Sequence, residues 1–170
     1  MSRHPPDLSF LRRDGTMHIH AGGKRPPVLP DDDVYFVFGS NLAGRHGQGA
    51  AKFAKEHKGA KYSAGLGFTG RAYALPTKDA ALRTLPLHRI QEEVVRFLER
   101  VAEHPERTFF LTRVGCGLAG YENADIAPMF EGAKSLKNIV WPIGWSPWMG
   151  DDVAYHGEDY EEWRLSRRGE

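Results

Sequence analysis

The amino-acid sequence predicts a layered α/β domain. Residues 34–38 form a continuous apolar run, which predicts a strand buried on both faces, as in a parallel sheet, and residues 108–114, with the apolar core Phe109-Phe110-Leu111, predict a second buried strand. Each run is followed by a glycine-rich loop and then by a helix-forming pattern. Strands that alternate with helices in this way are typical of a sheet covered by helices.

Length and composition exclude several classes of protein. The chain of 170 residues has the length of one domain, and it contains no apolar run of about 18 residues that would span a membrane. No apolar segment typical of a secretory signal follows Met1. Cys116 is the single cysteine, which excludes an internal disulfide and a cysteine-rich zinc site, so we expect a cytoplasmic protein.

The charge of the chain is unevenly distributed. The formal net charge is +1, whereas residues 34–150 hold fifteen basic and ten acidic side chains, a net charge of +5. A mildly basic middle suits an anionic small ligand at least as well as a polynucleotide. Charge alone therefore does not decide between these two kinds of partner.

The expected elements follow one another along the chain. They are a strand at 34–38, a helix at 50–58, short strand pieces within 62–75 that Pro76 ends, a helix at 87–101, a strand at 108–114, a helix at 123–134 and a strand at 138–142. The helix at 87–101 is the clearest, because its apolar residues recur at three- and four-residue steps.

Both ends of the chain are expected to be accessory. Residues 1–30 show little periodicity and predict an N-terminal arm or a small hairpin. The regular pattern places the domain at 31–150. Residues 151–170 hold seven acidic and three basic side chains and predict an acidic tail. A chain limited to 31–150 should then fold and bind the same ligand.

The two glycine-rich loops are candidate anion sites. Free backbone N–H groups at a helix start attract anions, and glycine allows a phosphate to approach the backbone closely. Two such loops on neighbouring strand ends would hold a diphosphate between them. Residues 115–120 spell G-x-G-x-x-G, but no acidic residue follows about 20 positions later, as a dinucleotide-binding fold requires. The alternative is that both loops are only tight turns.

Four short segments resemble the macro domain family. Residues 38–44 and 47–51 resemble its first ligand loop, in which an asparagine follows a buried strand and a glycine-rich turn leads into a helix. Residues 112–118 resemble its second loop, in the form typical of the terminal ADP-ribose protein glycohydrolase and ADP-ribose phosphatase branch. Residues 75–78 are similar to the "I-T-K" stretch of that branch. The resemblance covers roughly residues 34–143.

The resemblance implies a three-layer α/β/α fold with a mixed, largely parallel sheet, and a cleft for ADP-ribose or a derivative at the strand ends. It implies that Asn41 meets the distal ribose, that the second loop holds the diphosphate, and that Asp33 binds the adenine amino group. The expected ligand-binding residues are Asp33, Gly39, Ser40, Asn41, Gly47, Gly49, Ala50, Gly115, Cys116, Gly117, Leu118, Ala119, Gly120 and Tyr121.

The resemblance supplies only part of a catalytic site. In the glycohydrolase branch a lysine attacks the anomeric carbon of the ribose, and Lys78 stands at that position. The assisting aspartate directly after "G-C-G-L" is replaced by Ala119. A proton donor for the leaving group must then come from elsewhere, and we rank Glu122 first, ahead of Asp125 and Asp79. Cys116, beside a possible helix start, is a second candidate nucleophile, although a small packing role is the commoner one.

Three functions remain open at this point. The first is binding of ADP-ribose, with or without hydrolysis of an ADP-ribosyl bond, in which case an ADP-ribosylated macromolecule is a candidate partner. The second is a non-catalytic module that binds or sequesters a signal derived from ADP-ribose or NAD. The third is an interaction protein whose glycine loops are turns. No cofactor, metal ion or membrane is expected in any of them.

Overall fold

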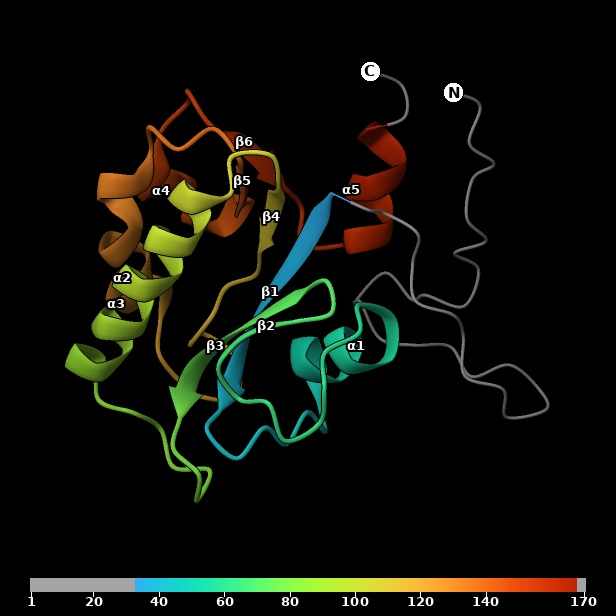
Figure 1. Cartoon of the computed structure of the whole chain (residues 1–170). Helices are drawn as coiled ribbons and strands as arrows, with labels where there is room; N and C mark the ends of the chain where they lie inside the picture. Colours follow the sequence, from blue (N-terminus) through green and yellow to red (C-terminus); the bar gives the residue numbers. More distant parts are fainter. Residues whose placement is uncertain (1–32, 168–170) are drawn as a thin grey trace.

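The computed structural model describes residues 33–167, which form one six-stranded sheet with helices on both faces (Figure 1). The strand order is β2-β3-β1-β4-β5-β6. The strands are β1 (Val34–Asn41), β2 (Gly67–Thr69), β3 (Ala72–Lys78), β4 (Thr108–Leu111), β5 (Ile139–Pro142) and β6 (Ala154–His156). All neighbours are parallel except β2 and β3, so the sheet is mixed and mostly parallel, as expected.

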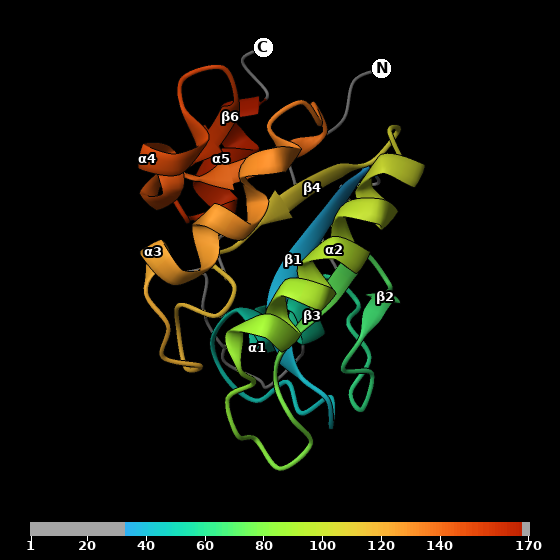
Figure 2. The ribbon, with the colours of Figure 1, turned by 90° about the vertical axis from the view of Figure 1, so that its left-hand side faces the viewer.

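Two groups of helices cover the sheet. The helices are α1 (Gly49–His57), α2 (Leu87–Glu103), α3 (Asn123–Ile126), α4 (Ser146–Met149) and α5 (Tyr160–Ser166), with 3₁₀ turns η1 (Ala127–Ala133) and η2 (Ile143–Trp145). In Figure 1, α2, α3 and α4 lie on one face, while α1 and α5 lie on the other. Figure 2 shows α2 crossing in front of β1 and β3.

The central strands are buried on both faces, which confirms the prediction made from their continuous apolar runs. Val37 of β1 belongs to the core cluster beneath α2, whereas its neighbours Phe36 and Phe38 belong to the cluster beneath α1 and α5. In β4, Phe109 and Phe110 divide between the two clusters in the same way. The period of two that turns a strand's side chains to opposite faces explains this division.

Strand β3 continues through Pro76 instead of ending there. Arg71 accepts a hydrogen bond from Phe36 of β1, so by alternation the backbone nitrogen of Pro76 faces away from β1. Strand β2 pairs only with residues 72–74. Pro76 therefore lies where, among the described residues, that edge of β3 has no strand beside it, and its missing N–H removes no ladder hydrogen bond.

Two other expected elements are shorter than predicted. Strand β4 ends at Leu111, the last residue that pairs with β1, and the hydroxyl and the backbone N–H of the next residue, Thr112, both donate to the carbonyl of Val37. The helix expected at 123–134 is divided into the four-residue α3 and the 3₁₀ turn η1, with Pro128 near the start of η1. Proline cannot donate the hydrogen bond that an α-helix would need there.

The segment expected to be an acidic tail contributes to the sheet and the core. Strand β6 pairs in parallel with β5, and Tyr160 of α5 is buried against Phe36, Phe53 and Phe110. The three residues of β6 carry no local pattern that would predict a strand, because β6 is stabilised by pairing with β5, which is distant in the sequence. The expected N-terminal arm, residues 1–30, lies outside the described residues. Within residues 33–167 no helix has the length and apolar character to cross a bilayer.

Candidate functional site

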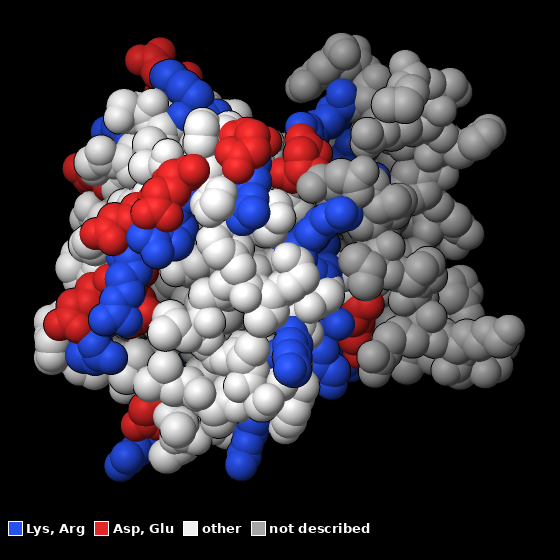
Figure 3. All heavy atoms as spheres, in the orientation of Figure 1, with Lys and Arg blue, Asp and Glu red and all other residues white. Residues whose placement is uncertain are grey.

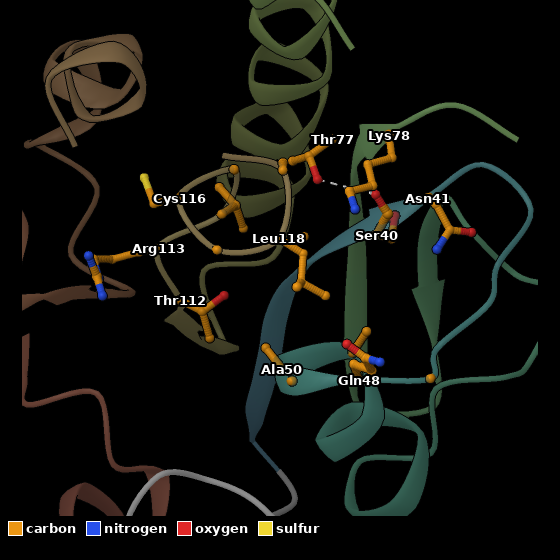
Figure 4. Close-up of a pocket in the computed structure, with 18 of the residues that line it drawn as sticks. Ser40, Asn41, Gln48, Ala50, Thr77, Lys78, Thr112, Arg113, Cys116 and Leu118 are labelled. Carbon is orange, nitrogen blue, oxygen red and sulfur yellow. Dashed lines mark hydrogen bonds between the residues drawn. The ribbon is translucent and has the colours of Figure 1, made fainter. Parts of the chain in front are cut away.

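A cavity of about 650 Å³ lies between the two glycine-rich loops, where β1, β3 and β4 end (Figure 4). Its lining residues are Gly39, Ser40, Asn41, Arg45, Gly47, Gln48, Gly49, Ala50, Ala51, Thr77, Lys78, Leu82, Thr112, Arg113, Val114, Gly115, Cys116, Gly117, Leu118, Ala119, His156 and Glu158. Carboxyl ends of parallel strands are the usual place for a ligand in an open α/β sheet.

The first loop is shaped by the side chain of Asn41. Its Nδ2 donates to the carbonyl of Arg45 at 2.9 Å, and its Oδ1 accepts the backbone N–H of Arg45 at 3.0 Å. The loop then enters α1 at Gly49, whose φ of +58° favours glycine. The first backbone N–H groups of a helix have no partner inside it, and here they belong to cavity-lining residues 49–51.

The second loop turns tightly and leaves three consecutive amides free. Gly115 has a φ of +79°, and a Cβ on it would lie 3.0 Å from Cδ1 of Ile126, so both the turn and the packing require glycine. The N–H groups of Cys116, Gly120 and Tyr121 donate to carbonyls within the loop or just before it. Within the described part of the chain, no hydrogen bond is formed by the N–H groups of residues 117–119. These amides are available to an anion.

This loop differs from the expected strand–loop–helix unit in one respect. Helix α3 has only four residues, and it begins at Asn123, after a capping box between Glu122 and Asp125. So short a helix contributes little dipole. Any anion bound by the second loop would be held by the loop amides themselves.

Close contacts fix the two loops relative to each other. A Cβ on Gly39 would lie 3.3 Å from Oγ1 of Thr77 and 3.5 Å from the backbone nitrogen of Gly115, so glycine at 39 lets the strand ends approach. The hydroxyl of Thr77 donates to the carbonyl of Ser40 at 3.3 Å. The hydroxyl of Thr84, between β3 and α2, donates to the carbonyl of Ala119 at 2.9 Å.

The lining carries a surplus of positive charge. Among residues 33–167, it contains Arg45, Lys78 and Arg113 against a single carboxylate, Glu158, which forms an ion pair with the guanidinium of Arg113. Within residues 33–167, the amino group of Lys78 has no hydrogen bond or ion pair. Figure 4 shows Arg113 and Lys78 on opposite sides of Leu118. The arrangement therefore suits an anion placed between two cationic ends.

Most of the predicted site residues come together in this cavity. Twelve of them line it: Gly39, Ser40, Asn41, Gly47, Gly49, Ala50, Lys78, Gly115, Cys116, Gly117, Leu118 and Ala119. Gly120, Tyr121 and Glu122 do not line it. The hydroxyl of Tyr121 donates instead to the carbonyl of Leu85 at 2.7 Å, and the backbone N–H of Glu122 donates to the carboxylate of Asp125 at 3.0 Å.

Asp33 lies far from the cavity, which corrects the expectation that it binds adenine. It precedes β1, whereas the cavity lies beyond the other end of that strand. An eight-residue strand is roughly 25 Å long. The carboxylate of Asp33 is paired instead with Arg167, at 3.3 Å.

Cys116 and His46 have no sign of activation. Burial raises the pKa of the Cys116 thiol to about 11, opposite to the lowering that a helix start would produce, so the thiol is not poised to act as a nucleophile. His46 is buried, its Nε2 lies 3.0 Å and 3.2 Å from the carbonyls of Lys61 and Ala64, and burial lowers its pKa. Its role is to hold two loop segments together.

No protein-family model matches the chain, and neither a curated protein nor a solved structure matches it. The geometry and charge of the cavity are therefore the observations that bear on function.

Sequence reasoning missed several lining residues. Gln48 and Thr112 stand inside the recognised segments and Arg45 stands between two of them, and their polarity was the available signal. Leu82 has a φ of +65°, which no sequence pattern indicates. His156 and Glu158 reach the cavity only because β6 joins the sheet, so no local signal could have found them.

Proposed function

We propose that the chain binds ADP-ribose, or a closely related nucleoside diphosphate derivative, in this cavity. The observation that carries the proposal is that free amides of two glycine-rich loops line one cavity whose side chains include three cations and one carboxylate. Backbone N–H groups and cations together are the usual means of holding a diphosphate. The volume also lies within the range of cavities that enclose ligands of this size.

The same geometry favours binding over hydrolysis. Attack by Lys78 on the ribose would need a nearby acid for the leaving group. Glu158, the one lining carboxylate in the described part of the chain, is paired with Arg113, which Figure 4 shows across Leu118 from Lys78. Asp79 adjoins Lys78, but its carboxylate accepts the N–H groups of Ala81 and Arg83 at 2.9 Å each and pairs with the guanidinium of Arg83. A non-catalytic binding module is therefore the preferred form of the proposal.

Titration calorimetry tests the proposal. We expect ADP-ribose to bind with 1:1 stoichiometry, ADP to bind more weakly, and ribose 5-phosphate more weakly still, because each truncated compound loses contacts to one side of the cavity. A chain that binds none of these compounds would contradict the proposal. So would a chain that binds inorganic phosphate as tightly as ADP-ribose, because the second half of the cavity would then contribute nothing.

A further inference from the structure

Positive charge is concentrated in the first half of the described fold. Residues 33–78 hold seven lysines and arginines against two acidic residues, Asp33 and Glu56. Along α2, by contrast, each of the three arginines forms an ion pair with a glutamate of the same helix. Figure 3 shows the alternation of blue and red along α2, and predominantly blue side chains over α1.

Four of these cations and one aromatic ring lie on α1 or on the segments that precede and follow it. We call Arg45, Lys52, Lys55, Lys61 and Tyr62 the α1 surface. Within residues 33–167, none of its four cations forms an ion pair. Tyr62 is 54% exposed, and the amino group of Lys55 lies 5.4 Å from the centre of its ring.

This surface is held rigidly and is continuous with the cavity through Arg45. The segment that carries Lys61 and Tyr62 is fixed to the first loop at three points. The N–H of Ser63 donates to the carbonyl of Gly44 at 2.9 Å, the hydroxyl of Ser40 donates to the carbonyl of Gly65 at 2.5 Å, and His46 bonds to the carbonyls of Lys61 and Ala64. The contact is so close that a Cβ on Gly44 would lie 2.2 Å from Ser63.

We infer that the α1 surface binds single-stranded nucleic acid. Unpaired cations that project from a backbone held in place by these contacts neutralise successive phosphates and release counterions. An exposed aromatic ring among them offers a base a face on which to stack, which a duplex with stacked bases cannot use. The inference goes beyond ADP-ribose binding and does not depend on it, because Lys52, Lys55, Lys61 and Tyr62 do not line the cavity.

Fluorescence anisotropy with a labelled oligothymidylate of about 20 nucleotides tests the inference. We expect saturable binding that weakens as NaCl is raised. The triple variant Lys52→Gln/Lys55→Gln/Lys61→Gln should bind at least about tenfold more weakly, and Tyr62→Ala about threefold more weakly, with Tyr62→Phe close to wild type. The matched control is Arg89→Gln/Lys134→Gln/Lys137→Gln, which removes the same charge from the other face of the sheet and should bind like wild type.

Several outcomes would overturn the inference. They are absence of binding, equal weakening by the control triple variant, equal affinity for a duplex of the same length, or preferential binding to vesicles that contain phosphatidylserine. Calorimetry of the lysine triple variant with ADP-ribose separates the two proposals. Unchanged ADP-ribose affinity beside lost oligonucleotide binding is expected, whereas oligonucleotide binding by a chain that does not bind ADP-ribose would contradict only the proposed function.

Discussion

Nδ1 of His156 accepts a hydrogen bond from the backbone N–H of Glu158 at 2.9 Å. The opposite ring nitrogen, Nε2, must then carry the proton, and it donates to the carbonyl of Leu111 at 2.7 Å. The neutral ring is stacked on Phe110 with the ring centres 3.8 Å apart. It supports Glu158, whose φ of +72° is unusual for a residue with a side chain, at the point where the carboxylate meets Arg113.

The folded chain should lose stability between pH 7 and pH 5. Burial lowers the pKa values of His156 and His57 from 6.5 to about 4. In that interval the unfolded chain binds protons at both residues and the folded chain does not, so the free energy of unfolding falls as the pH falls. The loss at pH 5 is about 2 kcal/mol for each histidine, and none is expected above pH 7. Urea unfolding at pH 7.5 and pH 5 measures it.

The variant His156→Asn separates this effect from general acid sensitivity. Asparagine retains an acceptor near the N–H of Glu158 but cannot titrate, so the variant should be less stable at pH 7.5 and should lose less stability on acidification. The exposed residue His88 provides the control, since His88→Asn should keep the full pH dependence of the wild type. A His156→Asn curve parallel to that of the wild type would contradict the assignment.

Valine in place of Gly117 should weaken ADP-ribose binding at least tenfold, or about 1.4 kcal/mol. A Cβ at this position meets no protein atom within 4 Å, so the side chain would extend into open space beside the free amides without disturbing the fold. Calorimetry gives the affinity, and an unchanged melting temperature shows that the fold is intact. Gly132→Val, also without a neighbour within 4 Å but remote from the cavity, is the control. Equal affinity of the wild type and Gly117→Val would exclude this loop as the diphosphate site.

Most elements of the fold could be predicted from local sequence patterns. Continuous apolar runs at β1 and β4, and the three- and four-residue steps of α2, depend on neighbours in the sequence, so they can be recognised there. Strand β6 is different, because three residues become a strand only through pairing with β5. The continuation of β3 through Pro76 also depends on distant residues, because no strand of the described fold lies beside Pro76 on the edge where β2 pairs with residues 72–74.

The residues of the candidate site also fall into two groups, those that local sequence could identify and those that it could not. The glycines at 39, 49 and 115 could be recognised because close approach and positive φ restrict the residue type. Glu158 could not be recognised from the sequence, since its place in the cavity depends on β6 and on His156. Asp33 illustrates the opposite error, because it precedes β1 while the first loop follows that strand, so the order of the sequence already places the two at opposite ends of the strand.

Tyr160 should be essential to the fold, although it lies in the segment expected to be an accessory tail. Its ring packs on three phenylalanines, and its hydroxyl accepts a hydrogen bond from the buried amino group of Lys58 at 3.0 Å. Tyr160→Ala should cost about 3–5 kcal/mol, and Tyr160→Phe about 1.5–3 kcal/mol. Urea unfolding measures both, with exposed Tyr62→Ala as the control, expected within about 0.5 kcal/mol of the wild type. A chain ending at residue 150 should aggregate, and a monomeric, ligand-binding 31–150 fragment would contradict this.

Finally, the chain should bind ADP-ribose without cleaving ADP-ribosyl bonds. A neutral lysine at position 78 could attack the anomeric carbon, but the leaving oxygen would depart without a proton, because the paired Glu158 is the one carboxylate that residues 33–167 contribute to the lining. Incubation with an ADP-ribosylated protein should release no ADP-ribose, and borohydride should trap no adduct on Lys78. The variant Glu122→Gln should behave like the wild type in every assay, since Glu122 lies outside the cavity. Release of ADP-ribose that is abolished in Lys78→Ala would instead establish a lysine-dependent hydrolase. Glu158→Gln would then show whether the carboxylate paired with Arg113 moves to supply the proton.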